Sequence, residues 1–211
     1  MKLRLVIVAA LALTFAPAAA GHGGGSNGFK STVTAVRPAL VGVTIGVRGG
    51  DDRLRLENRS DETIVVRGYG GEPYLRFGPD GVYENENSPA PYLNKDRFAR
   101  AEVPKSANDK AKPSWRKVSD GTVFEWHDHR IHWMSPIPPR PIRENPNEKR
   151  HVFNWQVPAT GNGKPFVIAG TLDYSPPNDG GVSPVFIAAL SAALLVTLGG
   201  LYLLRRRVGR R

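Results

Sequence analysis

The chain has 211 residues, of which 40% are hydrophobic and 23% are charged, a balance that is typical of globular proteins and excludes a fully disordered chain. It contains no cysteine, which excludes disulfide frameworks, thiolate metal sites and cysteine nucleophiles. The net charge is +10, but Lys2, Arg4 and five arginines after residue 204 supply seven of these charges. The middle of the chain is therefore nearly charge-balanced, and we expect no nucleic-acid partner.

The first twenty residues have the pattern of a secretory signal peptide. Lys2 and Arg4 precede an apolar run, and three alanines before residue 21 are small enough for a signal peptidase. The apolar run is too short for a stable membrane span. We expect residues 1–20 to be removed during export and residues 21–30 to form a flexible, glycine-rich leader.

Residues 31–174 favour short β-strands that are separated by turns. Stretches rich in Val, Thr and Ile, or with alternating polarity, predict strands at 31–36, 40–47, 53–57, 63–69, 74–77, 98–103, 122–131, 152–157 and 166–174. The turn-forming residues 58–62 predict a β-hairpin between the third and fourth of these strands. Because no segment here keeps a helical apolar period, we predict an all-β fold, an immunoglobulin-like β-sandwich.

The end of the chain has the pattern of a membrane anchor. Residues 175–184 begin with a Ser-Pro-Pro sequence and read as a stalk. Residues 185–204 are uncharged and predominantly apolar, and 20 residues of helix match the thickness of a bilayer core. The arginine-rich residues 205–211 should stay in the cytoplasm. We therefore predict a single-pass type I protein of the cell membrane, with its N-terminal domain outside the cytoplasm.

Three of the five histidines lie within six residues of one another. On a strand, His127 and His129 would point to the same face about 6.6 Å apart, from where two imidazoles can bind one metal ion. His132 would need a bulge or a strand end to join them, and Met134 is a soft ligand for reduced copper.

Other interpretations of this segment remain open. The histidines can be structural, hydrogen-bonded to backbone groups at a sheet edge, or they can sense protons or recognise a ligand. Asp128 can orient a neighbouring side chain or pair with Arg130.

His22 lies close to the expected cleavage site. Cleavage after Ala19 or Gly21 would place its imidazole near a free α-amine, where the two groups can chelate copper or nickel. The alternative is that His22 belongs to a leader without a role in binding.

The sequence shows no pattern of a known catalytic site. It shows no G-x-S-x-G nucleophile elbow between a strand and a helix, no H-E-x-x-H motif and no phosphate-binding glycine loop before a helix. The histidine cluster departs from the H-x-H-x-D-H pattern of zinc hydrolases, because Ile131 stands where that pattern has aspartate. We expect no enzymatic activity and no catalytic residues.

Two blocks resemble a family of exported, membrane-anchored actinobacterial proteins: GGEPYLRFGPDGVYENENSP at 70–89 and WHDHRIHWMS at 126–135. This resemblance implies a location in the cell envelope and carries over no catalytic residue. A looser likeness is to periplasmic copper-resistance β-sandwiches, with Trp155 and Gly170 on strands that correspond to theirs. The terminal anchor and the dense histidine cluster depart from that second pattern.

Two functions are consistent with these features. In the first, a cell-envelope protein presents a β-sandwich that binds other envelope proteins and has no chemistry of its own. In the alternative, the same domain binds a copper-type ion for delivery or sensing, through His127, His129 and His22. The first function requires no cofactor, whereas the alternative implies copper.

Overall fold

A computed structural model describes residues 28–177 and 184–209. The expected signal peptide, His22, most of the leader and the middle of the stalk lie outside these residues.

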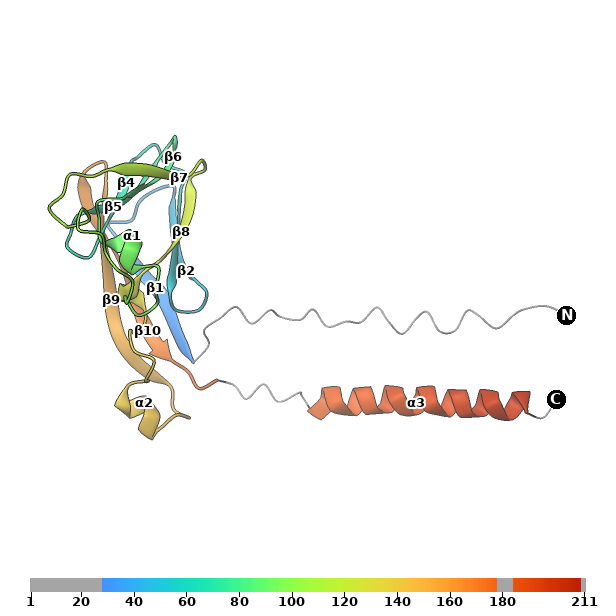
Figure 1. Ribbon diagram of the computed structural model, residues 1–211. Coiled ribbons are helices and arrows are strands. Elements are labelled where there is room, and N and C mark those ends of the chain that lie inside the picture. Colours follow the sequence, from blue (N-terminus) through green and yellow to red (C-terminus); the bar gives the residue numbers. More distant parts are fainter. Residues whose placement is uncertain (1–27, 178–183, 210–211) are drawn as a thin grey trace.

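Two antiparallel sheets form the body of the molecule, and they pack face to face as a β-sandwich (Figure 1). The strands are β1 (Phe29–Arg37), β2 (Val43–Arg48), β3 (Arg53–Asn58), β4 (Ile64–Arg67), β5 (Pro73–Gly78), β6 (Gly81–Asn85), β7 (Trp115–Ser119), β8 (Val123–His127), β9 (Arg150–Gly161) and β10 (Lys164–Tyr174). One sheet has the order β1-β10-β9-β4-β5-β6-β7 and the other the order β2-β3-β8. The all-β prediction is confirmed. The strands divide seven and three, whereas an immunoglobulin constant-type sandwich divides four and three.

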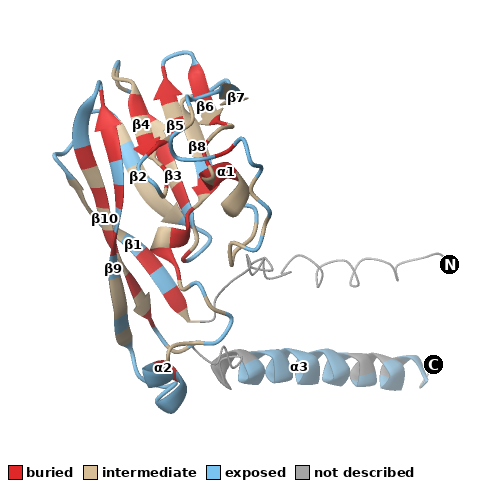
Figure 2. Ribbon diagram, turned by 60° about the vertical axis from the view of Figure 1, so that its left-hand side comes forward, coloured by how far each residue is buried: buried red, intermediate tan, exposed pale blue. Residues whose placement is uncertain are grey.

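The core lies between the two sheets, where buried and exposed positions alternate along the strands (Figure 2). Leu54 and Leu56 of β3 are fully buried, as the Arg-Leu-Arg-Leu alternation predicts. Trp126 of β8 packs against Phe77 of β5, with ring centroids 6.1 Å apart. This contact joins the three-stranded sheet to the seven-stranded one beside the histidine segment.

The predicted hairpin over residues 53–69 is wrong, because β3 and β4 belong to different sheets. The side chain of Asn58 donates to the Glu62 carbonyl (2.8 Å) and accepts from the Ser60 backbone amide (3.1 Å). These bonds close a corner that carries the chain from one sheet to the other. Both strands can then turn their apolar side chains into the same core from opposite sides.

Other strand predictions also differ from the structure. β1 begins at Phe29, inside the expected leader, because Phe29 packs edge-to-face against Tyr174 at a centroid distance of 5.5 Å. Beside this contact, the Ser175 amide donates to the Gly28 carbonyl (2.8 Å), so the two ends of the sandwich meet. Residues 98–103 form no strand within the described part of the chain. The strands β6 and β7 were not predicted.

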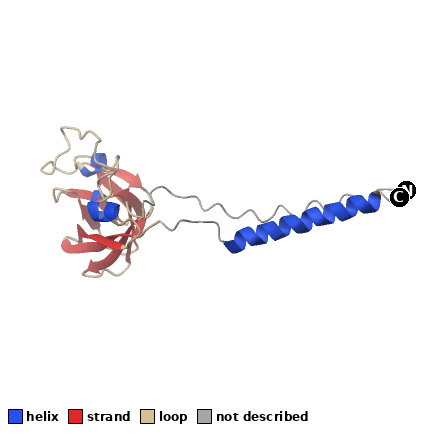
Figure 3. Ribbon diagram, turned by 90° about the horizontal axis from the view of Figure 1, so that it is seen from below, coloured by secondary structure: helices blue, strands red, loops and turns tan. Residues whose placement is uncertain are grey.

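Three helices accompany the sheets: α1 (Ala90–Leu93), α2 (Arg140–Glu144) and α3 (Pro184–Val208). α3 covers the whole of the predicted span 185–204 and lies apart from the sheets (Figure 3). By length and hydropathy, no helix among the described residues qualifies as a membrane span.

Candidate metal centre

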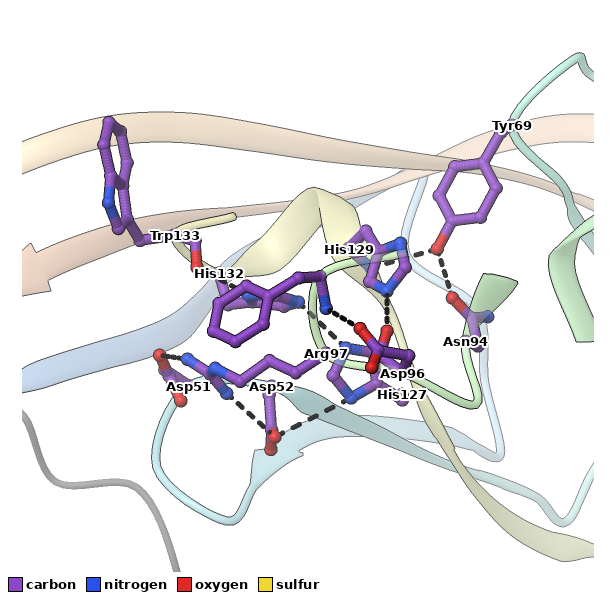
Figure 4. A network of polar contacts seen from close by, with 11 residues as sticks. Asp51, Asp52, Tyr69, Asn94, Asp96, Arg97, His127, His129, His132 and Trp133 are labelled. Carbon is purple, nitrogen blue, oxygen red and sulfur yellow. Dashed lines mark hydrogen bonds and ion pairs between the residues drawn. The ribbon is translucent and has the colours of Figure 1, made fainter. Parts of the chain in front are cut away.

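The three histidines predicted as ligands converge where β8 ends (Figure 4). His127 is the last residue of β8, and a short 3₁₀ turn, η1 (His129–Ile131), follows it. The ring centroid of His127 lies 4.9 Å from that of His129 and 4.7 Å from that of His132. The strand ends at His127, which is the condition under which we expected His132 to join the other two histidines. His129 lies in the turn, so His127 and His129 do not share one face of a strand as predicted.

Asp128 sets the turn that brings the histidines together. Its side chain accepts from the backbone amide of Arg130 (3.1 Å), which caps η1, and from the guanidinium of Arg130 (2.6 and 2.8 Å). It also accepts from the indole of Trp126 (3.0 Å). Burial alone would raise the pKa of this fully buried carboxyl, but the hydrogen bonds and charge of Arg130 hold it below its usual value. The predicted pairing of Asp128 with Arg130 is thus confirmed, and its role is structural.

The spacing of the imidazole nitrogens suits a single metal ion. One ring nitrogen from each histidine lies within 4.8 Å of the other two, and the two Nε2 atoms of His127 and His132 are 2.9 Å apart. Nitrogens on one tetrahedral ion lie about 3.3 Å apart, given metal–nitrogen bonds of about 2.05 Å. The rings would therefore have to rotate for all three nitrogens to reach one ion.

The proton positions in the His127–His132 pair also favour a cation between them. The Nδ1 of His132 lies 2.9 Å from the Trp133 carbonyl, which can only accept, so Nδ1 holds the proton and Nε2 presents a lone pair. The Nδ1 of His127 faces the Asp52 carboxylate at 3.7 Å, which favours a proton there too. Two lone pairs would then meet at Nε2. A proton on the Nε2 of His127 relieves this repulsion, and so does a metal ion bound by both nitrogens.

Burial keeps these imidazoles neutral. Burial, followed by the neighbouring His132, lowers the pKa of His127 to about 4, while Asp52 opposes the change. Burial also lowers the pKa of His132. Neutral imidazole is the form that binds metal ions, so both residues are ready to bind at neutral pH.

An acidic pair and an arginine, none of them predicted, lie on the other side of His127. Arg97 donates to Asp51 (2.6 Å) and to Asp52 (2.9 Å). The Asp52 carbonyl also accepts from the Asp128 amide (3.1 Å), which fixes it beside His127. A carboxylate behind a ligand histidine orients the ring and raises its basicity toward a metal ion. Asp52 has the position for this role.

The loop before Arg97 covers the third histidine. The Nε2 of His129 lies 2.9 Å from the Asp96 carbonyl, and the His129 backbone amide donates to the Tyr69 hydroxyl (3.0 Å). That hydroxyl in turn donates to Asn94. Since the Asp96 carbonyl occupies Nε2, a metal ion at this nitrogen would have to replace that hydrogen bond.

The remaining predicted ligands have different outcomes. Met134 is 38% exposed and lines a pocket with His129 and His132, so it lies near the cluster, and its sulfur as a metal ligand stays a prediction. His22 lies outside the described residues. His151, which was not predicted as a ligand, bonds Asp173 at the surface (2.9 Å).

No known family model matches this chain, and the searches of curated proteins and of solved structures also find no match. The geometry described above is therefore the basis for a functional proposal.

Proposed function

We propose that this protein binds a divalent transition-metal ion through His127, His129 and His132. The observation that carries the proposal is the convergence of three imidazole nitrogens within 4.8 Å, on a turn fixed by a buried ion pair. Clusters of buried histidines that serve packing alone do not require their ring nitrogens to face one another.

The donor set indicates the class of metal. Neutral imidazoles suit copper, zinc and nickel, whereas calcium and magnesium prefer several oxygen ligands. Copper(II) forms the most stable complexes of the divalent first-row ions with such ligands. We therefore propose copper(II) first and zinc second.

The proposed setting is the cell envelope, and it is supported by the sequence. Residues 1–20 have the pattern of an export signal, and residues 185–204 form an uncharged run that is followed by arginines. A single-pass protein of this kind would deliver or sense the metal outside the cytoplasm. The immunoglobulin-like subdivision of the sandwich remains a prediction.

One observation favours the other function, a metal-free domain that binds envelope proteins. His129 and His132 each have a backbone carbonyl within 2.9 Å, so both rings have a protein partner without any metal. In that case the histidines would fix the loop over β8, and a partner would dock elsewhere on the sandwich.

Metal binding by the full-length protein separates the two functions. We expect copper(II) and zinc(II), added to metal-free protein, to raise its melting temperature, with a stabilisation of about 2.7 kcal/mol at a hundredfold excess over Kd. His127→Ala and His132→Ala should each weaken binding, measured by calorimetry, by at least tenfold.

Matched controls are available in the other two histidines. His151→Ala, at a surface histidine, should leave the affinity unchanged, and His22→Ala measures any contribution of the leader. Unchanged affinity in the His127→Ala and His132→Ala variants, with native circular dichroism, would refute the metal centre. An unaltered melting temperature of the parent protein would do the same.

A further inference from the structure

A pocket of about 350 Å³ opens beside the histidine cluster. It is lined by His129, His132, Trp133, Met134, Ser135 and Phe153. This volume lies within the range of pockets that bind small molecules. Met134 is 38% exposed, so solvent reaches the pocket from that side.

The pocket reaches the cluster from the side that the protein leaves open. His127 does not line it; the Nδ1 of this ring faces Asp52, which accepts from Arg97. In Figure 4, Trp133, which lines the pocket, and Tyr69 lie on opposite sides of the histidines. An ion bound by the three imidazoles would have three protein ligands, which is the number that leaves a position for an added ligand.

The walls indicate the chemistry of such a ligand. Trp133 and Phe153 offer aromatic surfaces, and the Met134 thioether makes favourable contacts with aromatic rings. Among the described residues that line the pocket none is a carboxylate, lysine or arginine. A ligand with its own charged substituent would therefore find no partner on these walls, whereas a neutral aromatic ring would be well accommodated.

We propose that this pocket binds a small neutral N-heteroaromatic molecule whose ring nitrogen coordinates the metal ion. The inference rests on the proposed metal centre. Coordination requires one lone pair from the ligand nitrogen, and no proton or electron is transferred. The ring would lie between Trp133 and Phe153, and His129 and His132 would present the ion to its nitrogen.

Cobalt(II) in the full-length protein gives a direct readout, because its visible absorption changes when a ligand is added to its coordination sphere. The probes are benzimidazole, imidazole, which has the donor but a smaller ring, and benzoate, which has an aromatic body and a negative charge. We expect benzimidazole to change the spectrum and to bind at least tenfold more tightly than imidazole or benzoate. Without cobalt, its affinity should fall by at least tenfold.

Two wall variants test the location. Trp133→Leu and Phe153→Leu should each reduce the preference for benzimidazole over imidazole by threefold or more while cobalt still binds. Trp115→Leu, on β7 outside the pocket, is the matched control and should keep the preference.

The outcomes distinguish the two proposals. Failure of cobalt(II), copper(II) and zinc(II) to bind would overturn the metal centre and this inference with it. Bound cobalt with a spectrum that no probe alters would overturn the inference alone. A preference for benzoate, or full retention of the benzimidazole preference in both wall variants, would also contradict it.

Discussion

His127 is a poorly exposed histidine whose two ring nitrogens both face polar groups. Its side chain is only 10% exposed, one ring nitrogen faces a carboxylate, and the other faces a second histidine. Protonation would place a positive charge in a poorly solvated position beside His132. The imidazole is therefore neutral at physiological pH, and the nitrogen lone pair that a proton would occupy is available to a metal ion.

The metal-free protein should lose stability in acid because of this residue. The pKa of His127 is about 4 in the folded protein, below the ordinary value of 6.5, so between these two values the unfolded chain binds the proton that the folded one does not. Stability is fully present above about pH 6.5 and decreases as the pH falls toward 4, by on the order of 2 kcal/mol. Urea unfolding at a series of pH values with a chelator present measures this.

The control for this prediction is His127→Gln, which keeps a polar side chain but cannot titrate. Its stability should fall less steeply over the same pH interval, and the carboxylates that contribute in both proteins cancel in the difference. Parallel pH profiles for the two proteins would show that His127 titrates as it does in the unfolded chain.

The sequence predicted the identity of the three cluster histidines, since their density alone was unusual. It could not predict which residues from distant parts of the chain lie beside these histidines. Asp52 faces His127 from 75 residues away, and Arg97, 30 residues away, binds Asp52; no local periodicity connects these positions. An Asp-Asp pair just before an alternating strand was the one available signal. The position of this pair beside His127 follows only from the pairing of β3 with β8, which places Arg53 opposite His127.

At the level of the elements, β9 and β10 form the longest pairing of the sandwich. Gly170 of β10 stands opposite Trp155 of β9, and the indole ring covers the glycine. A Cβ at this position would lie 2.1 Å from the Trp155 ring and 2.2 Å from the Thr32 carbonyl. The two residues singled out for their likeness to copper-resistance proteins are thus packed against each other in the core.

Gly170→Ala should therefore destabilise the fold. Neither the indole nor the backbone of β1 can move away without disturbing the core, and overpacking of this kind costs about 1–3 kcal/mol. Gly46→Ala is the matched control, because a Cβ there meets nothing within 4 Å, and its effect should be within about 0.5 kcal/mol. Denaturant unfolding measures both, and equal stabilities would contradict the packing described for Trp155.

Strands with an apolar face were recognised from the sequence, whereas two polar strands were not. The alternating leucines of β3 and the long apolar stretches of β9 and β10 were recognised. The strands β6 and β7 carry mostly polar residues, and their pairing is supported by Arg116, which bonds Glu84 across the two strands (2.8 Å). Such cross-strand pairs have no signature within a single segment, so these strands could be found only in three dimensions.

For the whole molecule, the distribution of charge predicts how the chain is held in the cell. Residues 185–204 carry no charged side chain, and five arginines follow them. In the described part of α3, large apolar side chains such as Leu195 and Val196 are more than two-thirds exposed. Exposed apolar side chains of this kind are typical of a surface that contacts lipid or a partner, and we propose the membrane.

Cell fractionation tests the proposed anchor. The full chain should sediment with membranes and resist extraction by alkaline carbonate, whereas a chain that ends at residue 184 should be released. Replacing Leu195 and Val196 by arginine in the full chain should have the same effect, since each charge at the centre of a span costs about 2.5–3.5 kcal/mol. Recovery of the full chain in the soluble fraction would contradict the anchor.

The meeting of Gly28 and Ser175 has a consequence for the connectivity of the sandwich. Because the first and last strands are neighbours and end side by side, a short linker could join them, and new termini could be opened in a surface loop such as that between β5 and β6. Every strand would keep its neighbours in such a circular permutant. We therefore expect the histidine centre to form in the permutant as well, because it depends on how the strands pair and not on their order in the chain.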